Sequence, residues 1–189
     1  MEKVKEVPYG VADFVTVMEQ NLYYVDKTMF IPELEKQPRN LFFIRPRRFG
    51  KSIFLSMLHS YYDCNQSAKF QSLFGKLWIG QHPTELQGKY QVLFLDFSQV
   101  SGNIDSLERN FDFYCSVKLD GFMRRYGESY SEETREKVRK AEYAMDKLAF
   151  IHDEAAQKGF SLYLIVDEYD NFTNVVLNEH GEKVYHAIT

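Results

Sequence analysis

Leu41-Phe-Phe-Ile-Arg-Pro-Arg-Arg-Phe-Gly-Lys-Ser52 joins an apolar run to a basic turn that ends in glycine, lysine and serine. The apolar run, residues 41–44, predicts a strand buried on both faces, as in a parallel sheet. After the turn, apolar side chains recur at helical spacing, which predicts an amphipathic helix over residues 51–63. This order of strand, loop and helix is the first indication of an α/β fold.

The turn ends in Gly50-Lys51-Ser52, which matches the last three positions of the phosphate-binding pattern G-x-x-x-x-G-K-[ST]. Gly50 allows the backbone to approach a phosphate closely, and the helix N-terminus that follows attracts anions. Lys51 can reach the β- and γ-phosphates and is a catalytic candidate, while the Ser52 hydroxyl suits Mg²⁺. The turn therefore predicts a site for a nucleoside triphosphate and its Mg²⁺ ion.

The first half of the turn departs from this pattern. Arg45 stands where the pattern has its first glycine, and Pro46 pushes Arg45 towards extended dihedral angles. The loop must therefore leave the strand by another path. Arg47, Arg48 and Phe49 are candidates for contact with the nucleotide. Two other interpretations stay open, namely a basic surface turn before a helix and an arginine cluster that contacts nucleic acid.

A second motif combines an apolar run with two carboxylates. Residues 162–166 predict another buried strand, and Asp167 and Glu168 follow directly at its end. In P-loop hydrolases the first such acid holds Mg²⁺ and the next acts as general base. We therefore expect Asp167 to be a metal ligand and Glu168 to be the catalytic base, with Asp170 in support. The alternative is a strand that simply ends in a polar turn.

The remaining elements agree with a layered fold. A strand is expected over residues 90–97, with Asp96 at its end as a possible Mg²⁺ partner or a solvated strand end. Helices are expected over residues 107–125 and, after a capping box of Ser129 and Glu132, in one long helix that Gly159 caps. Strands that alternate with helices predict an α/β fold with a mostly parallel sheet, whose ligand site lies at the carboxyl ends of the strands.

Composition excludes several classes of protein. The 189 residues suffice for one domain, and the net charge of −4 does not favour bulk attraction to nucleic acid. The two cysteines have no metal-ligand spacing, which indicates a reducing, cytoplasmic compartment. Residues 1–10 lack the apolar core of a signal peptide, and the apolar runs are too short to cross a bilayer, so we expect no membrane partner.

The chain resembles the predicted AAA-ATPase-like family of bacterial and archaeal proteins. The resemblance rests on four segments, Asn21–Thr28, Phe43–Ser52, Leu93–Ser98 and Leu162–Asn171. The family carries the same Arg-Pro-Arg-Arg-Phe-Gly-Lys-Ser variant, so the missing glycine is a family trait. The resemblance implies a P-loop ATPase core with an added catalytic glutamate, which supports the roles assigned above to Lys51, Ser52, Asp167 and Glu168.

The resemblance has a further implication for the segment before the loop. In such families this segment lies near the nucleotide base. Tyr24, Asp26 and Lys27 are therefore candidates for contact with adenine or ribose. The resemblance also implies that many members carry a C-terminal nuclease-like domain. A nucleic-acid partner is therefore expected only indirectly, through such a domain, of which nothing is expected within these 189 residues.

The resemblance also sets an expectation for domain organisation. Residues 1–189 are expected to form a single P-loop ATPase-like domain, with a lead-in segment at 1–40 and a partial nucleotide-binding core at 41–189. The family fold has three layers and five core strands, whereas the sequence indicates three strands. The chain thus resembles the N-terminal portion of the family, and we expect a fold that is incomplete at the C-terminus. Unpaired strand edges favour self-association of such a fragment.

The leading functional prediction is binding of ATP with Mg²⁺, followed by slow hydrolysis that drives a conformational switch. We expect ATPase activity in the full-length protein, because sensor and arginine-finger residues are absent from these 189 residues. Two alternatives stay open. One is a phosphotransferase that acts on a nucleotide or small molecule, and the other is a non-catalytic interaction module with a vestigial phosphate loop.

Overall fold

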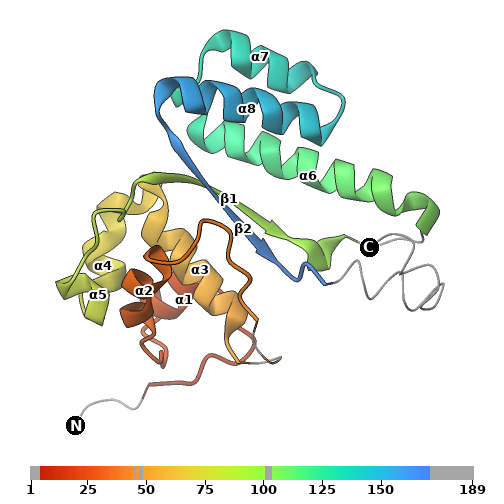
Figure 1. Ribbon diagram of the computed structural model, residues 1–189. Coiled ribbons are helices and arrows are strands. Elements are labelled where there is room, and N and C mark those ends of the chain that lie inside the picture. The colour runs from red at the N-terminus through yellow and green to blue at the C-terminus, as the bar shows by residue number, and fades with distance from the viewer. Residues whose placement is uncertain (1–4, 45, 47–48, 101–103, 171–189) are drawn as a thin grey trace. The chain divides into compact units, whose positions relative to one another are not determined.

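The computed structural model describes residues 5–44, 46, 49–100 and 104–170 (Figure 1). Helices and one small sheet make up these residues, which confirms the predicted α/β class. The chain divides into two compact units, residues 1–90 and 91–189. The predicted boundary between residues 40 and 41 does not coincide with this division. The single domain over 1–189 and the three-layer P-loop arrangement stay predictions.

The first unit is built from short helices around α3, Lys51–Tyr62, whose predicted bounds are confirmed to within one residue. The other elements are α1 (Phe14–Glu19), η1 (Thr28–Phe30), α2 (Ile31–Glu35), η2 (Cys64–Lys69), α4 (Phe70–Phe74) and α5 (Trp78–Gln81). The inner face of α3 packs against α1, as the helical spacing of its apolar residues predicts. The fully buried core consists largely of aromatic and branched side chains: Phe14, Val17, Ile31, Met57, Tyr61, Leu73, Phe74 and Ile79.

Two capping arrangements define α1 and the start of the lead-in segment. The Asp13 carboxylate accepts a hydrogen bond from the Thr16 amide at 2.7 Å and begins the helix. Asn21 ends it in the left-handed region with φ 53°, a conformation that asparagine tolerates better than most residues. The Leu22 amide then donates to the Val17 carbonyl at 2.9 Å, which is the Schellman pattern and turns the chain back.

The strand predicted at residues 41–44 is wrong. No strand is assigned there, and the side chains of Phe42 and Ile44 are 79% and 80% exposed. Phe43 alone turns inward and stacks on Phe54 with ring centroids 5.0 Å apart. An apolar run makes a segment suitable for a sheet, but a ladder also needs a neighbouring strand. In the described residues the sheet consists of β1 and β2 only, so residues 41–44 have no strand neighbour there.

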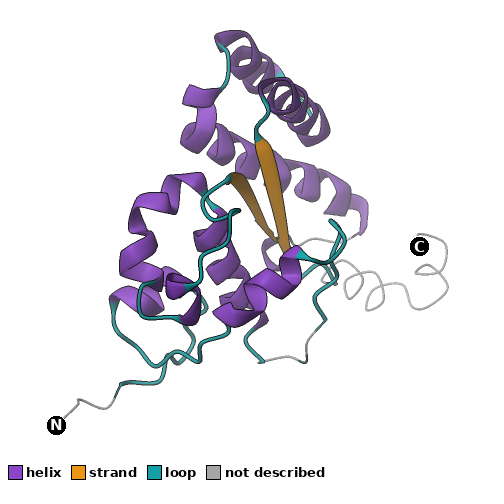
Figure 2. Ribbon diagram, turned by 60° about the vertical axis from the view of Figure 1, so that its left-hand side comes forward, coloured by secondary structure: helices purple, strands orange, loops and turns teal. Residues whose placement is uncertain are grey.

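The second unit contains the sheet and its covering helices (Figures 1 and 2). β1 (Tyr90–Asp96) and β2 (Ser161–Asp167) lie side by side and run parallel, which confirms two predicted strands. α6 (Ile104–Tyr126), α7 (Glu132–Lys140) and α8 (Ala144–Lys158) connect them and lie together on one side of the strands. Within the residues described, no helix has the length and apolarity needed to cross a membrane.

The single long helix predicted after residue 129 is instead two helices, α7 and α8. The N-cap of α7 is Ser131, not Ser129, and its side chain accepts a hydrogen bond from the Thr134 amide. Ala141 leaves the helix, and α8 starts where the Ala144 amide donates to Asp112 of α6 at 2.8 Å. The cap of α8 thus comes from a residue that is distant in sequence, which local periodicity cannot reveal. Gly159 ends α8 with φ 73°, as predicted.

Glu154 of α8 stabilises the start of α7. Its carboxylate accepts hydrogen bonds from the Ser131 amide at 2.8 Å and the Ser131 hydroxyl at 2.9 Å, and it pairs with Lys158 at 2.7 Å. Burial acts to raise the pKa of Glu154, but the hydrogen bonds from Lys158, Thr134 and Ser131 outweigh burial and lower the pKa to about 2. This contribution to stability is therefore complete above pH 4.5, the ordinary pKa, and is lost as the pH falls towards 2.

We expect Glu154→Gln to reduce the free energy of unfolding at pH 7 by about 1–3 kcal/mol, because charged hydrogen bonds are lost. Near pH 2 the difference should shrink to a small remainder, because Glu154 is then protonated in the unfolded state and about half-protonated in the folded state. Urea denaturation followed by circular dichroism at the two pH values measures the difference. Glu132→Gln, at an exposed position of α7, is the matched control. An equal loss at both pH values would contradict the electrostatic explanation.

Candidate nucleotide site

The turn that is predicted to bind phosphate enters α3 through a left-handed glycine. Gly50 has φ 75° and ψ 32° and is the N-cap of the helix that begins at Lys51. A side chain at this position would be strained, because L-residues rarely adopt such a φ. Phe54 donates its amide to the Gly50 carbonyl at 3.2 Å and closes the first helical turn. Arg47 and Arg48 lie outside the described residues.

The lead-in segment runs beside this turn and is anchored at alternate positions. Asp26 accepts hydrogen bonds from the Thr28 amide at 2.8 Å, the Thr28 hydroxyl at 2.7 Å and the Trp78 amide at 2.7 Å. The Thr28 hydroxyl in turn accepts from the Ile79 amide at 3.1 Å. Asp26 and Thr28 therefore fasten the segment to the N-terminus of α5. The Asp26 carboxylate has a structural task, and its contact with a nucleotide stays a prediction.

Tyr24, the third anchored position, packs edge-on against Phe14 with ring centroids 5.3 Å apart. Burial raises the pKa of Tyr24 well above its ordinary value, and the nearby Asp26 carboxylate raises it further. The Tyr24 hydroxyl is therefore neutral throughout the physiological range. It can act as a hydrogen-bond donor or acceptor, but not as an anion.

A cavity of about 370 Å³ lies between the lead-in segment and the turn. Its walls are mostly apolar and aromatic, and the Lys27 ammonium is its charged group: Val7, Pro8, Tyr23, Tyr24, Val25, Lys27, Phe49, Gly50, Ile53 and Phe54. Lys27 donates from Nζ to the Phe49 carbonyl oxygen at 3.4 Å. The structure thus brings together the predicted residues Tyr24, Lys27, Phe49 and Gly50 around one space.

Tyr23 and Val25 also line this cavity, although neither was predicted as a site residue. The β-prone run Tyr23-Tyr24-Val25 indicated an extended segment here. In an extended chain, alternate residues point to opposite sides. Tyr23, Val25 and Lys27 alternate with Tyr24 and Asp26, and all of these residues except Asp26 line the cavity.

The acidic strand end lies in the second unit. Asp167 is the last residue of β2, and 4% of its surface is exposed. Its Oδ1 accepts a hydrogen bond from the Glu168 amide at 2.9 Å. Glu168 has φ 51°, which is uncommon for a residue other than glycine, asparagine or aspartate. Such a conformation costs about 1–2 kcal/mol and is frequent at functional sites.

Asp96 ends β1 at the same edge of the parallel sheet as Asp167. Its Oδ1 accepts hydrogen bonds from the Ser98 amide at 3.0 Å and the Ser98 hydroxyl at 2.7 Å, while Oδ2 accepts from Gln99 at 3.3 Å. The carboxylate therefore caps the turn η3 (Phe97–Gln99). Of the two interpretations of Asp96, this favours the structural one.

Hard oxygen donors are present at both predicted metal positions, Ser52 in the first unit and Asp167 in the second. Among the described residues there is no group of three or more His, Cys, Asp or Glu that could hold a metal ion. A nucleotide-bound Mg²⁺ does not need such a group, because phosphate oxygens and water supply most of its ligands. A hydroxyl and a carboxylate therefore fit the chemistry of Mg-ATP.

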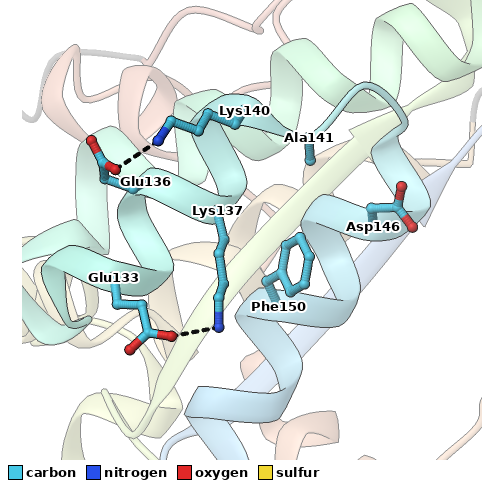
Figure 3. A pocket seen from close by; sticks show the side chains of 7 residues that line it. All are labelled: Glu133, Glu136, Lys137, Lys140, Ala141, Asp146 and Phe150. Carbon is cyan, nitrogen blue, oxygen red and sulfur yellow. Dashed lines mark hydrogen bonds and ion pairs between the residues drawn. The ribbon is translucent and has the colours of Figure 1, made fainter.

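A further hollow of about 410 Å³ lies between α7 and α8 (Figure 3). Lys137 pairs with Glu133 at 2.7 Å and Lys140 with Glu136 at 2.9 Å, while the ring of Phe150 of α8 lies beside the Lys137 side chain. Lysines and glutamates are thus paired along about two turns of α7. This arrangement is typical of a solvated helix face, and no predicted site residue lies in it.

Comparisons with known proteins identify the family. The model of the AAA-ATPase-like family, described as predicted AAA-ATPase, matches residues 8–189. A protein of Azotobacter chroococcum mcd 1, named as an uncharacterised protein in the vnfD 5′ region, is 43% identical over 63 residues. That match covers 33% of this chain and 12% of the Azotobacter protein. No solved structure matches the chain. With its left-handed Gly50 before the Lys51 helix and a family match over nearly its whole length, the chain belongs to the predicted AAA-ATPase family.

Proposed function

We propose that this chain binds Mg-ATP at the turn before α3 and that the complete protein hydrolyses the nucleotide. The observation that carries the proposal is the geometry of Gly50, which is left-handed and leads directly into the helix that begins at Lys51. Such a helix start directs backbone amides and a positive dipole end at an anion. Membership of a predicted ATPase family supports the same assignment.

The cavity beside the turn supports a place for the nucleotide base. Its volume, about 370 Å³, lies within the range of small-molecule sites, and its aromatic walls suit a flat heterocycle. In this proposal Tyr24 and Phe49 contact the base, and Asp26 holds the lead-in segment in position. Arg47, Arg48 and Lys51 contact the phosphates.

Hydrolysis requires the acidic pair of β2 in addition to the turn. The oxygen of a water molecule attacks the γ-phosphorus, the bond from that phosphorus to the β–γ bridging oxygen breaks, and ADP and phosphate leave. Glu168 accepts the proton of the attacking water as general base. Ser52 and Asp167 would hold Mg²⁺, and the ion would supply positive charge to the phosphate oxygens. Lys51 stabilises the charge that develops on the transferred phosphoryl group and is the second catalytic residue.

The conformational switch belongs to the same proposal. Lys51 and Ser52 lie in one compact unit, and Asp167 and Glu168 lie in the other. Glu168 has a strained backbone conformation. This strain supports the proposal that the end of β2 changes conformation when the nucleotide binds or leaves. Phe42, Ile44 and Leu164 expose large apolar side chains to solvent. In the proposal, residues 41–44 and β2 become buried when they join a larger sheet or when two chains associate.

Calorimetric titration of the wild-type chain with Mg-ATP tests the proposal. We expect saturable binding of one nucleotide per chain, and Mg-GTP as a second ligand shows how selective the base contact is. An assay of phosphate release follows hydrolysis in the same samples. If neither nucleotide binds, the chain is an interaction module with a vestigial loop. If ADP forms only when an acceptor molecule is added, the protein is a phosphotransferase.

A further inference from the structure

Lys27 reaches the phosphate-binding turn from the lead-in segment. Its Nζ atom donates to the Phe49 carbonyl at 3.4 Å and lies 3.5 Å from the place that a Cβ atom on Gly50 would occupy. Gly50 is the N-cap of α3, so the Lys27 ammonium stands at the positive end of that helix. The side chain is half-buried and lines the cavity described above.

The backbone on both sides of Lys27 is held in place. Asp26 is hydrogen-bonded to Trp78, and Thr28 is fully buried and hydrogen-bonded to Ile79. Because residues 26 and 28 are both fastened to α5, the residue between them has a defined direction. Lys27 is therefore aimed at the turn by the fold, unlike an exposed lysine whose direction is set by solvent.

The location is electrostatically unfavourable for a cation by itself. The helix N-terminus carries the equivalent of about half a positive charge, and the Lys27 ammonium stands beside it. The neighbouring Asp26 directs Oδ1 to Thr28 and Oδ2 to Trp78, so its carboxylate is turned towards α5. An anion at this position relieves the repulsion, and a polyphosphate is the anion that the turn is proposed to bind.

We propose that Lys27 is a second phosphate-contacting lysine of this site, supplied by the lead-in segment. When ATP binds, the ammonium exchanges its hydrogen bond to the Phe49 carbonyl for phosphate oxygens. Lys51 approaches the phosphates from α3, and Lys27 approaches them from the lead-in segment. The inference rests on the proposed nucleotide binding. It assigns Lys27 to the phosphates instead of the adenine or ribose contact predicted from the family resemblance.

Calorimetry with two probes, Mg-ATP and inorganic tripolyphosphate, tests this assignment in the full chain. We expect Lys27→Met to weaken binding of both probes by about ten-fold, which corresponds to about 1.4 kcal/mol. Lys27→Arg keeps the charge and should bind both within about three-fold of the wild type. Lys36→Met removes an exposed lysine of the same unit and should change neither affinity.

The outcomes separate this inference from its alternatives. Weaker ATP binding with unchanged tripolyphosphate binding assigns Lys27 to the base or ribose and overturns the inference. A lower melting temperature of Lys27→Met that Lys27→Arg does not restore assigns it a structural role and also overturns the inference. If Lys51→Ala loses ATP while Lys27→Met binds like the wild type, only this inference fails. If the wild type binds neither probe, the proposed function fails with it.

Discussion

Replacement of Lys51 by alanine is expected to weaken Mg-ATP binding by about 100-fold. Lys51 is the first residue of α3 and follows the left-handed Gly50, so its ammonium is the proposed contact to the β- and γ-phosphates. Two charge-assisted hydrogen bonds at about 1.5 kcal/mol each amount to about 3 kcal/mol. Each 1.4 kcal/mol is a factor of ten in Kd, which leads to the expected loss. Calorimetric titration measures it directly.

The matched control for this variant is Lys36→Ala in α2. The Lys36 side chain is 66% exposed and pairs with Glu33 at 2.7 Å, an interaction worth less than about 1 kcal/mol at a surface. The Lys36→Ala variant removes one positive charge from the same unit as Lys51→Ala does, so it shows what a change in net charge alone does to ATP binding. Equal affinities of wild type, Lys51→Ala and Lys36→Ala would show that the turn does not bind phosphate.

Replacement of Glu168 by glutamine is expected to reduce the rate of ATP hydrolysis by about 10²–10⁴-fold with little change in ATP affinity. A general base contributes a factor of this size, and the glutamine amide cannot accept the proton. Because glutamine has the same length and adopts the same φ with the same strain, the variant should fold like the wild type. Phosphate release by the full-length protein measures the rate, and calorimetry measures the affinity.

Two further variants distinguish a catalytic Glu168 from a structural one. Glu168→Gly should also lose hydrolysis, but its stability should stay equal or rise by up to about 1 kcal/mol, since glycine relieves the left-handed strain. Glu132→Gln, at an exposed carboxylate of the same unit, should hydrolyse ATP normally. Normal turnover in Glu168→Gln, or a large loss of stability in Glu168→Gly, would remove Glu168 from the mechanism.

The sequence correctly predicted those features of the candidate site that depend only on residues close together in the chain. The glycine before Lys51 adopts the left-handed conformation that starts a helix, and α3 has the expected bounds and apolar face. β2 ends at Asp167, as the change from apolar to acidic residues indicates. In each case the information lies within one segment of about ten residues, where helical spacing and turn chemistry operate.

Features that depend on contacts between residues distant in the sequence could not be predicted in this way. Residues 41–44 have the composition of a buried strand, yet their exposure depends on whether another strand lies beside them. The division into α7 and α8 depends on Asp112 and Glu154, which cap helix starts that are remote in sequence. Neither effect leaves a local pattern.

The sequence by itself determined the family, the glycine turn before Lys51 and the acidic strand end, because each is a short motif whose chemistry is local. Only the tertiary structure placed Lys27 beside Phe49, 22 residues further along the chain. That contact arises because Asp26 and Thr28 are tied to α5, about 50 residues away, by hydrogen bonds to Trp78 and Ile79. A side chain that is aimed by long-range hydrogen bonds can be recognised only after the chain has folded.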